Sequence, residues 1–396
     1  MSRAHQTSLY SILKSHAIKN WFYRFLDGMI RFLVSVIPLL HGICSKKSKI
    51  TKDDEFIFFL YGGLGDCLLV LDLINTLARF RKVTIFCDFN PQNIACFMIG
   101  EPNIISIDKN NASTQLRKYR SSEKTDNKIF IQTSPVFECY LVSQLLGIKR
   151  SVGFLANFFT IRSIGLFIRP QRSAEKSRVK QFERLGREIC SYIGVEVSKP
   201  STDYQIKSRD SDDKDKSSVV VSVTKSGQWD MGRLPIEQYV SLVNLLIEHG
   251  VTVLLVGNHS ERNHIKKICS SVDKPEFVTN LAGKTSVQQL SSLIKQARFV
   301  VANDNGVAHM SAFLGVRVLT IFLFSDPEVY KWHTENYQYL FNKIAGCMPC
   351  IGSKMFPQDH YPFKCKNRLV CQYAVDANMI IDKLKVLSWL PPKVVC

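Results

Sequence analysis

An aspartate that follows closely spaced glycines is the first group in this sequence that could do chemistry. Residues 61–66 read YGGLGD and come directly after an apolar run. A carboxylate that flexible glycines hold at the end of a strand can approach a hydroxyl group and remove its proton as a new bond forms. Asp66 is therefore our candidate general base, and Gly63 and Gly65 form the candidate acceptor loop. The competing interpretation is that Asp66 only caps the helix that follows.

The same glycine loop could instead be a nucleotide-binding loop. A P-loop requires the pattern G-x4-G-K-[ST], which is absent here. A dinucleotide fingerprint fits better, because Gly63-x-Gly65 opens a helix and Asp88 ends the next strand about 20 residues later. However, Leu68 stands where the third glycine belongs, and the carboxylate of Asp66 would compete with a pyrophosphate for the positive end of the helix. We favour the general base.

A second polar turn opens a helix in the other half of the chain. The apolar run 299–302 leads into residues 303–312, NDNGVAHMSA. A glycine-containing turn at a helix start offers amide groups to an anion, and His309 falls within the first turns. Asp304 could accept hydrogen bonds from ribose hydroxyls or fix the turn. The alternative is an ordinary helix cap followed by a core histidine.

Four cysteines have the spacing C-x2-C-x14-C-x5-C, namely Cys347, Cys350, Cys365 and Cys371. This spacing is compatible with a structural zinc site, with two disulfides or with free thiols in an ordered loop. The last gap is longer than zinc ribbons prefer. The other eight cysteines are scattered singly, which is typical of buried thiols in a reducing cytoplasm.

These groups need a scaffold, and the pattern of apolar runs predicts one. Short β-rich runs alternate with helical segments, which implies parallel sheets with right-handed crossovers. The alternation starts twice, so we predict an α/β protein with two doubly wound, Rossmann-like domains that face a central cleft. Ligands of such sheets bind beyond the carboxyl ends of the strands. The expected strands are 56–61, 83–87, 104–107, 129–132, 219–224, 251–256, 277–281, 299–302 and 316–322, and the main helices are 68–80, 236–249, 287–296 and 307–314.

The polar stretch KSRDSDDKDKSS divides the two halves and sets the predicted domain boundaries. We expect a basic leader at 1–52, an acceptor-side domain at 53–206, a linker at 207–218 and a donor-nucleotide domain with the cysteines at 219–375. The residues 376–396 are expected to form a helix and tail that cross back to the first domain.

The charge balance favours an anionic partner. The formal net charge is +18, and residues 1–52 contain nine Lys or Arg but one acid around an apolar run of about 13 residues, shorter than the roughly 20 that span a bilayer. Such a segment can lie in the headgroup layer of an anionic membrane. An amphipathic helix packed on the protein and a signal peptide are the alternatives. A nucleic-acid partner is not expected, because no recognition motif accompanies the charge.

The ordered set of motifs resembles glycosyltransferase family 9, the heptosyltransferase-like enzymes of lipopolysaccharide core assembly. The resemblance rests on Asp304-Asn305-Gly306-x-x-His309, on the loop ending at Asp66, on Val256-Gly257 with Glu261, and on the stretch 280–286, NLAGKTS. It extends roughly from residue 56 to 371.

The resemblance implies a GT-B fold and an inverting transfer that needs no metal or other cofactor for catalysis. By position, Asp66 resembles the family's base and Glu261 a residue that contacts the nucleoside. Asp304, Asn305, Gly306 and His309 match the donor-binding loop. The implied substrates are a nucleotide-sugar donor, with ADP-heptose the usual one, and a lipid-linked saccharide acceptor at the inner face of the cytoplasmic membrane.

Two departures from the family pattern concern the donor. Asn305 stands where the family usually has Ser or Thr, and its amide could still donate to a phosphate. The usual Lys-x-Trp-Pro element is replaced by residues 232–235, GRLP, so Arg233 or Lys225, in the loop after Thr224, is our candidate cation. A different nucleotide sugar, or a non-catalytic nucleotide- or lipid-binding protein on this scaffold, is the alternative.

Overall fold

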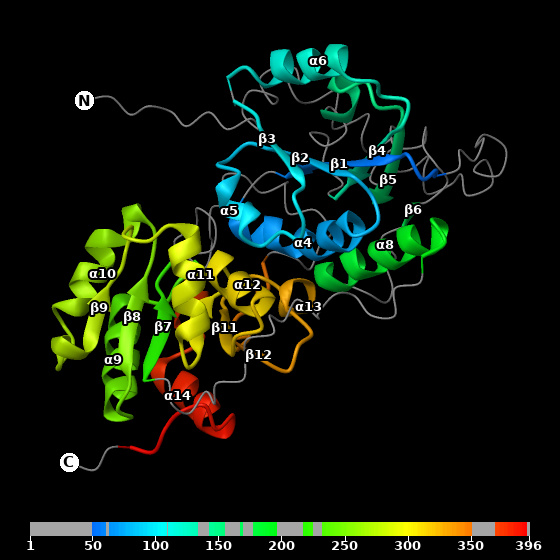
Figure 1. Cartoon of the computed structure of the whole chain (residues 1–396). Coiled ribbons are helices and arrows are strands. Elements are labelled where there is room, and N and C mark those ends of the chain that lie inside the picture. The colour runs from blue at the N-terminus through cyan, green and yellow to red at the C-terminus, as the bar shows by residue number, and fades with distance from the viewer. Residues whose placement is uncertain are drawn as a thin grey trace. The chain divides into compact units, whose positions relative to one another are not determined.

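The computed structural model contains two compact units, each built on its own parallel sheet (Figure 1). The first unit holds Met1–Gly62, Val70–Glu175 and Lys180–Ser201, and the second holds Gly63–Leu69, Lys176–Val179 and Thr202–Cys396. By their contacts, two short pieces therefore belong with the second unit. The structure describes residues 50–60, 63–108, 110–133, 142–154, 167–168, 177–195, 217–224, 232–350 and 369–393.

The first sheet has six parallel strands in the order β3-β2-β1-β4-β5-β6. From β1 the chain continues to β2 and β3 toward one edge of the sheet, and from β4 it continues to β5 and β6 toward the other edge. The direction in which strands are added therefore reverses between the neighbours β1 and β4. Loops at such a reversal are where α/β proteins bind ligands. The strands are β1 (Glu55–Leu60), β2 (Val83–Cys87), β3 (Asn103–Ser106), β4 (Lys128–Gln132), β5 (Arg150–Phe154) and β6 (Phe167–Ile168), and the helices are α4 (Leu64–Ala78), α5 (Gln92–Ala95), α6 (Ala112–Ser122) and α8 (Arg178–Tyr192).

The central strands of this sheet are buried along their whole length. Every residue of β1 and β4 is buried, including the charged residues Glu55 and Lys128. Their charges are paired: Lys128 Nζ lies 3.0 Å from Glu55 Oε2 and donates to the hydroxyl of Tyr119 at 2.9 Å. Burial lowers the pKa of Lys128, but these hydrogen bonds raise it more, so the amine stays charged. The pair fixes the beginnings of β1 and β4 side by side.

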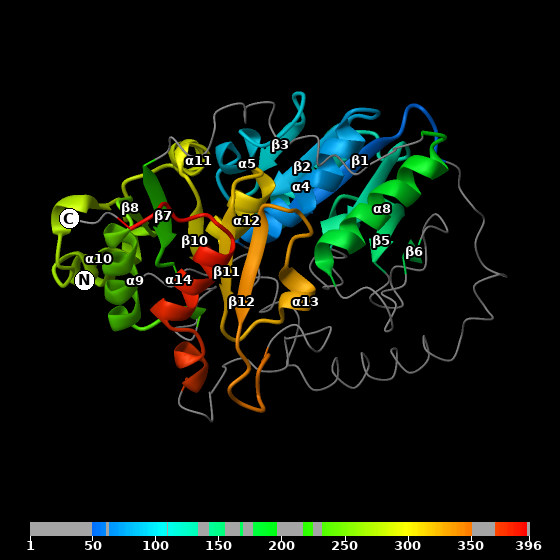
Figure 2. The ribbon, with the colours of Figure 1, turned by 90° about the horizontal axis from the view of Figure 1, so that it is seen from below.

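The second sheet also has six parallel strands, in the order β12-β11-β10-β7-β8-β9. Figures 1 and 2 show α9, α10 and α14 on one face and α11 and α12 on the other. The winding therefore reverses between β7 and β10. The strands are β7 (Ser218–Ser222), β8 (Thr252–Val256), β9 (Val278–Asn280), β10 (Val300–Asn303), β11 (Val318–Phe322) and β12 (Tyr337–Phe341), and the helices are α9 (Ile236–Glu248), α10 (Arg262–Cys269), α11 (Val287–Gln296), α12 (Gly306–Phe313), α13 (Pro327–Tyr330) and α14 (Ala377–Val386).

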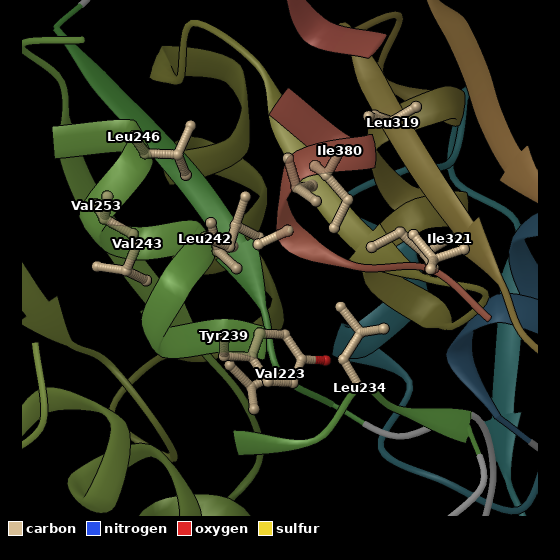
Figure 3. Close-up of a cluster of buried hydrophobic side chains, with 14 of the residues drawn as sticks. Val223, Leu234, Tyr239, Leu242, Val243, Leu246, Val253, Leu319, Ile321 and Ile380 are labelled. Atoms are coloured by element: carbon tan, nitrogen blue, oxygen red, sulfur yellow. The ribbon is translucent and has the colours of Figure 1, made fainter. Parts of the chain in front are cut away.

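A large apolar core supports this second sheet (Figure 3). Leu242 and Leu246 of α9 are fully buried, as is Ile380 of α14, and they meet the side chains of Leu319 and Val253 from the strands. Continuous apolar strands of this kind require helices on both faces. The prediction of two doubly wound parallel-sheet domains is confirmed.

Helix α14 belongs to the second unit, where its buried residues Ile380, Ile381 and Leu384 pack in the same core as α9. The main chain of Ala377 donates to the side chain of Gln238, at the start of α9, at 2.9 Å. We had expected this helix and tail to cross back to the first domain. Its apolar face instead completes the layer that α9 begins.

Several predicted segments fall outside the described residues. The basic leader is described only from residue 50, and the predicted linker only at Ser217 and Ser218. Among the residues that the structure does describe, no helix combines the length and apolar character needed to cross a bilayer.

Candidate functional site

The reversal of winding between β7 and β10 locates the candidate site in the second unit. The two strands are paired from Val300 with Val220 to Ala302 with Ser222, so their carboxyl ends lie next to each other. The predicted donor residues Thr224 and Asp304 follow these two ends directly. Sequence and topology therefore bring the donor-binding candidates to the place where doubly wound sheets bind ligands.

Two asparagine amides tie these strand ends together. The Asn303 amide donates to the carbonyl of Thr224 at 3.2 Å and to the hydroxyl of Tyr239 at 2.7 Å. The Asn305 amide donates to the same carbonyl at 2.8 Å and to Ser222 Oγ at 3.3 Å. The four side chains in these hydrogen bonds all belong to buried residues, namely Asn303, Asn305, Ser222 and Tyr239. We name Asn303 and Asn305 the amide clasp.

Asn305 also begins helix α12. Its side-chain oxygen accepts from the main-chain N–H of Val307 at 2.9 Å and of Ala308 at 3.3 Å, as expected of a residue that caps a helix. We had expected its amide to donate to a phosphate. In the structure, oxygen and nitrogen are both engaged within the protein, because this side chain caps one helix and holds one strand end.

Asp304 and His309 lie together beside this cap, and both are more than nine-tenths buried. His309 Nε2 is 3.4 Å from Asp304 Oδ1, and Asp304 Oδ2 accepts from Ser325 Oγ at 2.5 Å. Asp304 Oδ1 has no hydrogen-bond partner among the described residues. A buried carboxylate oxygen in this state is suited to accept from a ligand hydroxyl.

Glu261, another predicted residue, ends the short 3-10 helix His259–Glu261 that follows β8, and its carboxylate contacts the residue that follows β7 by two positions. Its Oε2 accepts from Thr224 Oγ1 at 3.0 Å and from the main-chain N–H of Asn258 at 2.9 Å. Gly257 leaves room for this arrangement, since a Cβ there would come within 2.9 Å of the same oxygen. Thr224 and Glu261 are thus brought together on the β8 side of the amide clasp.

Asp66 lies in the first turn of α4, and its side chain is 59 % exposed. Its Oδ1 accepts from Arg178 Nη1 at 3.5 Å. Gly65, which precedes it, belongs to the second unit and touches its site directly: a Cβ added there would lie 2.8 Å from His309 Cδ2 and 3.4 Å from Gly306 Cα. The candidate base is therefore one residue from a glycine that packs on the predicted donor loop.

Tyr330, at the end of α13, lies among the charges of this site. The guanidinium of Arg178 is 5.7 Å from the centroid of its ring. Burial raises the pKa of Tyr330, the charge of Arg178 lowers it, and the carboxylates of Asp304 and Asp66 raise it further. The phenol therefore stays protonated and can donate a hydrogen bond at neutral pH.

The candidate cations are placed differently. Arg233 is half-buried, and its carbonyl accepts from the Gln372 amide at 3.3 Å. Burial raises the pKa of Tyr239 to about 12, while the Asn303 hydrogen bond and the charge of Arg233 act in the opposite direction. Arg233 is thus close enough to act on Tyr239, whose hydroxyl accepts from the Asn303 amide of the clasp. Lys225, the other candidate, lies outside the described residues.

The predicted zinc ligands do not assemble within the part of the chain that is described. Cys347 is exposed and Cys371 is buried, and no three His, Cys, Asp or Glu residues in the described ranges form a group that could hold a metal ion. Cys365, the fourth predicted ligand, lies outside those ranges. Cys350 is anchored through its main chain, which donates to the carbonyl of Phe324 at 2.7 Å.

Sequence reasoning missed several residues that line the site. Arg178, Ser325, Tyr330 and Trp332 come from segments to which no chemistry was assigned. One signal was present: the buried strand β11 leads at residues 324–327 into FSDP, a polar turn at the same sheet edge as the donor loop. Arg178 gave no such signal, because it lies 112 residues from its partner Asp66.

Comparison with known sequences shows relatives of a single kind. The profile of Glycosyltransferase family 9 (heptosyltransferase) matches residues 127–358, more than half of the chain. The lipopolysaccharide core heptosyltransferase OpsX of Haemophilus influenzae is 24 % identical over 183 residues, which are 41 % of this chain and 50 % of the relative. The lipooligosaccharide heptosyltransferase 2 of the same species is 30 % identical over 98 residues, 24 % of this chain and 28 % of the relative. The chain thus matches about half the length of the first relative and less of the second.

Solved structures share the fold along most of the chain. A family 9 glycosyltransferase from Veillonella parvula has a TM-score of 0.62 at 14 % identity and covers 86 % of this chain and 99 % of its own. The Escherichia coli heptosyltransferase WaaC, solved with ADP-2-deoxy-2-fluoro heptose, has a TM-score of 0.60 at 15 % identity and covers 84 % of this chain and 99 % of its own. The sequence motifs, the two doubly wound sheets and the family profile agree, and this chain belongs to glycosyltransferase family 9.

Proposed function

We propose that this chain is an inverting, metal-independent glycosyltransferase that moves a sugar from a nucleotide diphosphate to a lipopolysaccharide core or a similar lipid-linked acceptor. The donor proposed first is ADP-heptose. The observation that carries the proposal is the position of Asp304 and His309, buried at the strand ends where the second sheet reverses its winding.

The proposed donor follows from the relatives as well as from the site. Curated relatives are named as heptosyltransferases, and WaaC was solved with ADP and with ADP-2-deoxy-2-fluoro heptose. In this chain, Asp304 Oδ1 would accept from a ribose hydroxyl, and His309 Nε2 would donate to the diphosphate. Glu261, at the end of the neighbouring strand, would accept from the nucleoside.

In the proposed reaction, the acceptor hydroxyl attacks the sugar's anomeric carbon from the face opposite the diphosphate. Asp66 takes the hydroxyl proton as the new carbon–oxygen bond forms. The bond between the anomeric carbon and the diphosphate oxygen breaks, and its electron pair leaves with the nucleotide. Because attack and departure are on opposite faces, the configuration inverts. The exposure of Asp66 supports this role, since an acceptor must reach it.

The leaving diphosphate gains negative charge, which the protein must stabilise. The start of α12 presents the dipole of an eight-residue helix, with Gly306 at its first position. Main-chain and imidazole N–H groups that are held in place before the reaction can stabilise such charge without reorganising. Arg178 and Arg233 are the described candidates for a cation, and Lys225 remains a third. Metal independence is proposed on this basis.

The donor experiment has two arms. In a thermal-shift screen of ADP-, UDP- and GDP-sugars, ADP-heptose should raise the melting temperature most, because a ligand that binds only the folded protein stabilises it. Transfer to a heptose-deficient core acceptor should then proceed equally with and without EDTA. If no nucleotide sugar shifts the melting temperature and none is turned over, the proposal is wrong and the non-catalytic alternative takes its place. If EDTA abolished turnover, only the proposed metal independence would be wrong.

We also propose that the basic residues 1–52 hold the enzyme at the inner face of the cytoplasmic membrane. Nine Lys or Arg against one acid favour an anionic surface, and the attraction falls as salt screens it. The full chain should therefore sediment with vesicles that contain phosphatidylglycerol at low salt and less with purely zwitterionic vesicles. A chain that begins at residue 50 is the control and should not sediment. Equal sedimentation of both chains would contradict the proposal.

A further inference from the structure

Trp332 contacts the histidine of the candidate donor site through its one polar atom. Its indole Nε1 donates to His309 Nδ1 at 2.9 Å. The ring centroids of the two side chains are 6.4 Å apart, and the Trp332 ring also meets Phe313, of the same helix as His309, edge-on at 6.4 Å. The hydrogen bond and the packing against Phe313 together set the position of the indole relative to α12.

The direction of this hydrogen bond determines where the histidine carries its proton. An indole N–H can only donate, so the nitrogen that receives it must offer a lone pair. His309 Nδ1 is therefore unprotonated, and the proton of the neutral ring is on Nε2.

A carboxylate lies on the other side of the ring. Asp304 Oδ1 is 3.4 Å from His309 Nε2, so an acceptor oxygen faces the nitrogen that carries the proton. Ser325 holds the other oxygen of Asp304 and so keeps the carboxylate facing the ring. Trp332 and Asp304 thus face the two ring nitrogens with a donor and an acceptor, which together favour the tautomer that is protonated on Nε2.

We propose that Trp332 is a positioning residue that holds His309 in the tautomer with its proton on Nε2. The ring then presents an N–H to the donor diphosphate, and Asp304 Oδ1, which has no hydrogen-bond partner among the described residues, keeps a lone pair for the sugar or ribose hydroxyl. This inference rests on the proposed donor site, although the position of the proton can be measured without any ligand.

The competing interpretation is that Trp332 only fills space beside Phe313. Trp332→Phe tests the two interpretations, because it keeps an aromatic ring and removes the N–H together with part of the ring volume. Trp389→Phe is the matched control. It removes an indole from the same unit at a place where the ring packs on Phe299, with centroids 6.2 Å apart, instead of on His309.

The first measurement is the long-range hydrogen–nitrogen NMR spectrum of protein with 15N-labelled histidine, in which His309 is assigned by comparison with His309→Gln. The wild type and Trp389→Phe should show an unprotonated Nδ1 and a protonated Nε2. Trp332→Phe should show protonation of Nδ1 in a fraction of the molecules. A wild-type ring with its proton on Nδ1 overturns the inference, as does a Trp332→Phe spectrum identical to that of the wild type.

The second measurement is of ADP binding and steady-state transfer. Trp332→Phe should weaken ADP binding and raise the KM for the donor about tenfold, the effect of one hydrogen bond to a charged group. The kcat at saturating donor should change little, because Asp66 is untouched. Unchanged ADP affinity in Trp332→Phe overturns the positioning role. Failure of the wild type to bind ADP would instead refute the proposed donor site, and the NMR result would still decide where the proton lies.

Discussion

Replacing Asp66 with asparagine is expected to lower the rate of sugar transfer by about 10²- to 10⁴-fold, the usual contribution of a general base. Asparagine has nearly the same shape but cannot take the acceptor's proton. The affinity for ADP should be unchanged, because the donor candidates Asp304 and His309 are not altered. Single-turnover transfer measures the first quantity and calorimetric titration with ADP the second.

The loss of sugar transfer in Asp66→Asn should not come from a loss of folding stability. Asp66 is largely exposed, and an exposed ion pair such as that with Arg178 contributes about 0–1 kcal/mol. Asp382→Asn is a matched control, since Asp382 is 71 % exposed and pairs with Lys385 at 3.3 Å on α14. That variant should transfer sugar like the wild type. Full turnover by Asp66→Asn would show that another group, or water alone, removes the proton.

Replacing Gly65 with alanine is expected to reduce transfer by about 10²-fold, because misplacing a catalytic group by about 1 Å is enough for such a loss. The new methyl group would lie 2.8 Å from His309 Cδ2 and 3.4 Å from the main chain of Gly306. Either the first turn of α4 or the donor loop must move, and Asp66 is the next residue. The measurement is kcat and the donor KM, since displacement of His309 should also raise the KM.

Gly63→Ala provides the comparison two residues earlier. A Cβ at Gly63 would meet Asp66 Oδ2 at 3.8 Å, an ordinary van der Waals distance. This variant should retain most of the activity, although it too adds a methyl group to the same loop. If both alanine variants behaved alike, general stiffening of the loop would explain the loss, and close packing of Gly65 on the donor loop would not be needed for transfer.

The sequence predicted the central strands well because they are buried on both faces. The continuous apolar runs at β1, β2, β10 and β11 stand out without any further information. The edge strand β12, Tyr337–Phe341, was not predicted, because only its first residue is buried and its pattern is weak. The start of α4 was predicted four residues late, since glycine is a poor helix former and the prediction began only at Leu68.

The sequence identified candidate site residues where a polar turn follows an apolar run or where the chain matches a family motif, and their role in donor binding stays a prediction. Asp304 and His309 were identified in both ways, and Glu261 was identified by the motif. The partners that orient them were not, because spacing does not reveal which distant segments meet: Trp332 is 23 residues from His309. Asn305 shows a different limit, since capping and ligand binding use the same amide group and only the structure distinguishes them.

The amide clasp has a consequence for how the site can respond to its surroundings. Asn303 and Asn305 join the strand ends through uncharged groups that neither gain nor lose protons. Changes in pH or salt concentration will therefore change how strongly the site attracts a negatively charged ligand, but they will leave the amide clasp intact. The clasp binds residue 224 only through its carbonyl, so we expect substitutions of the Thr224 or Arg233 side chain to leave the two strand ends joined.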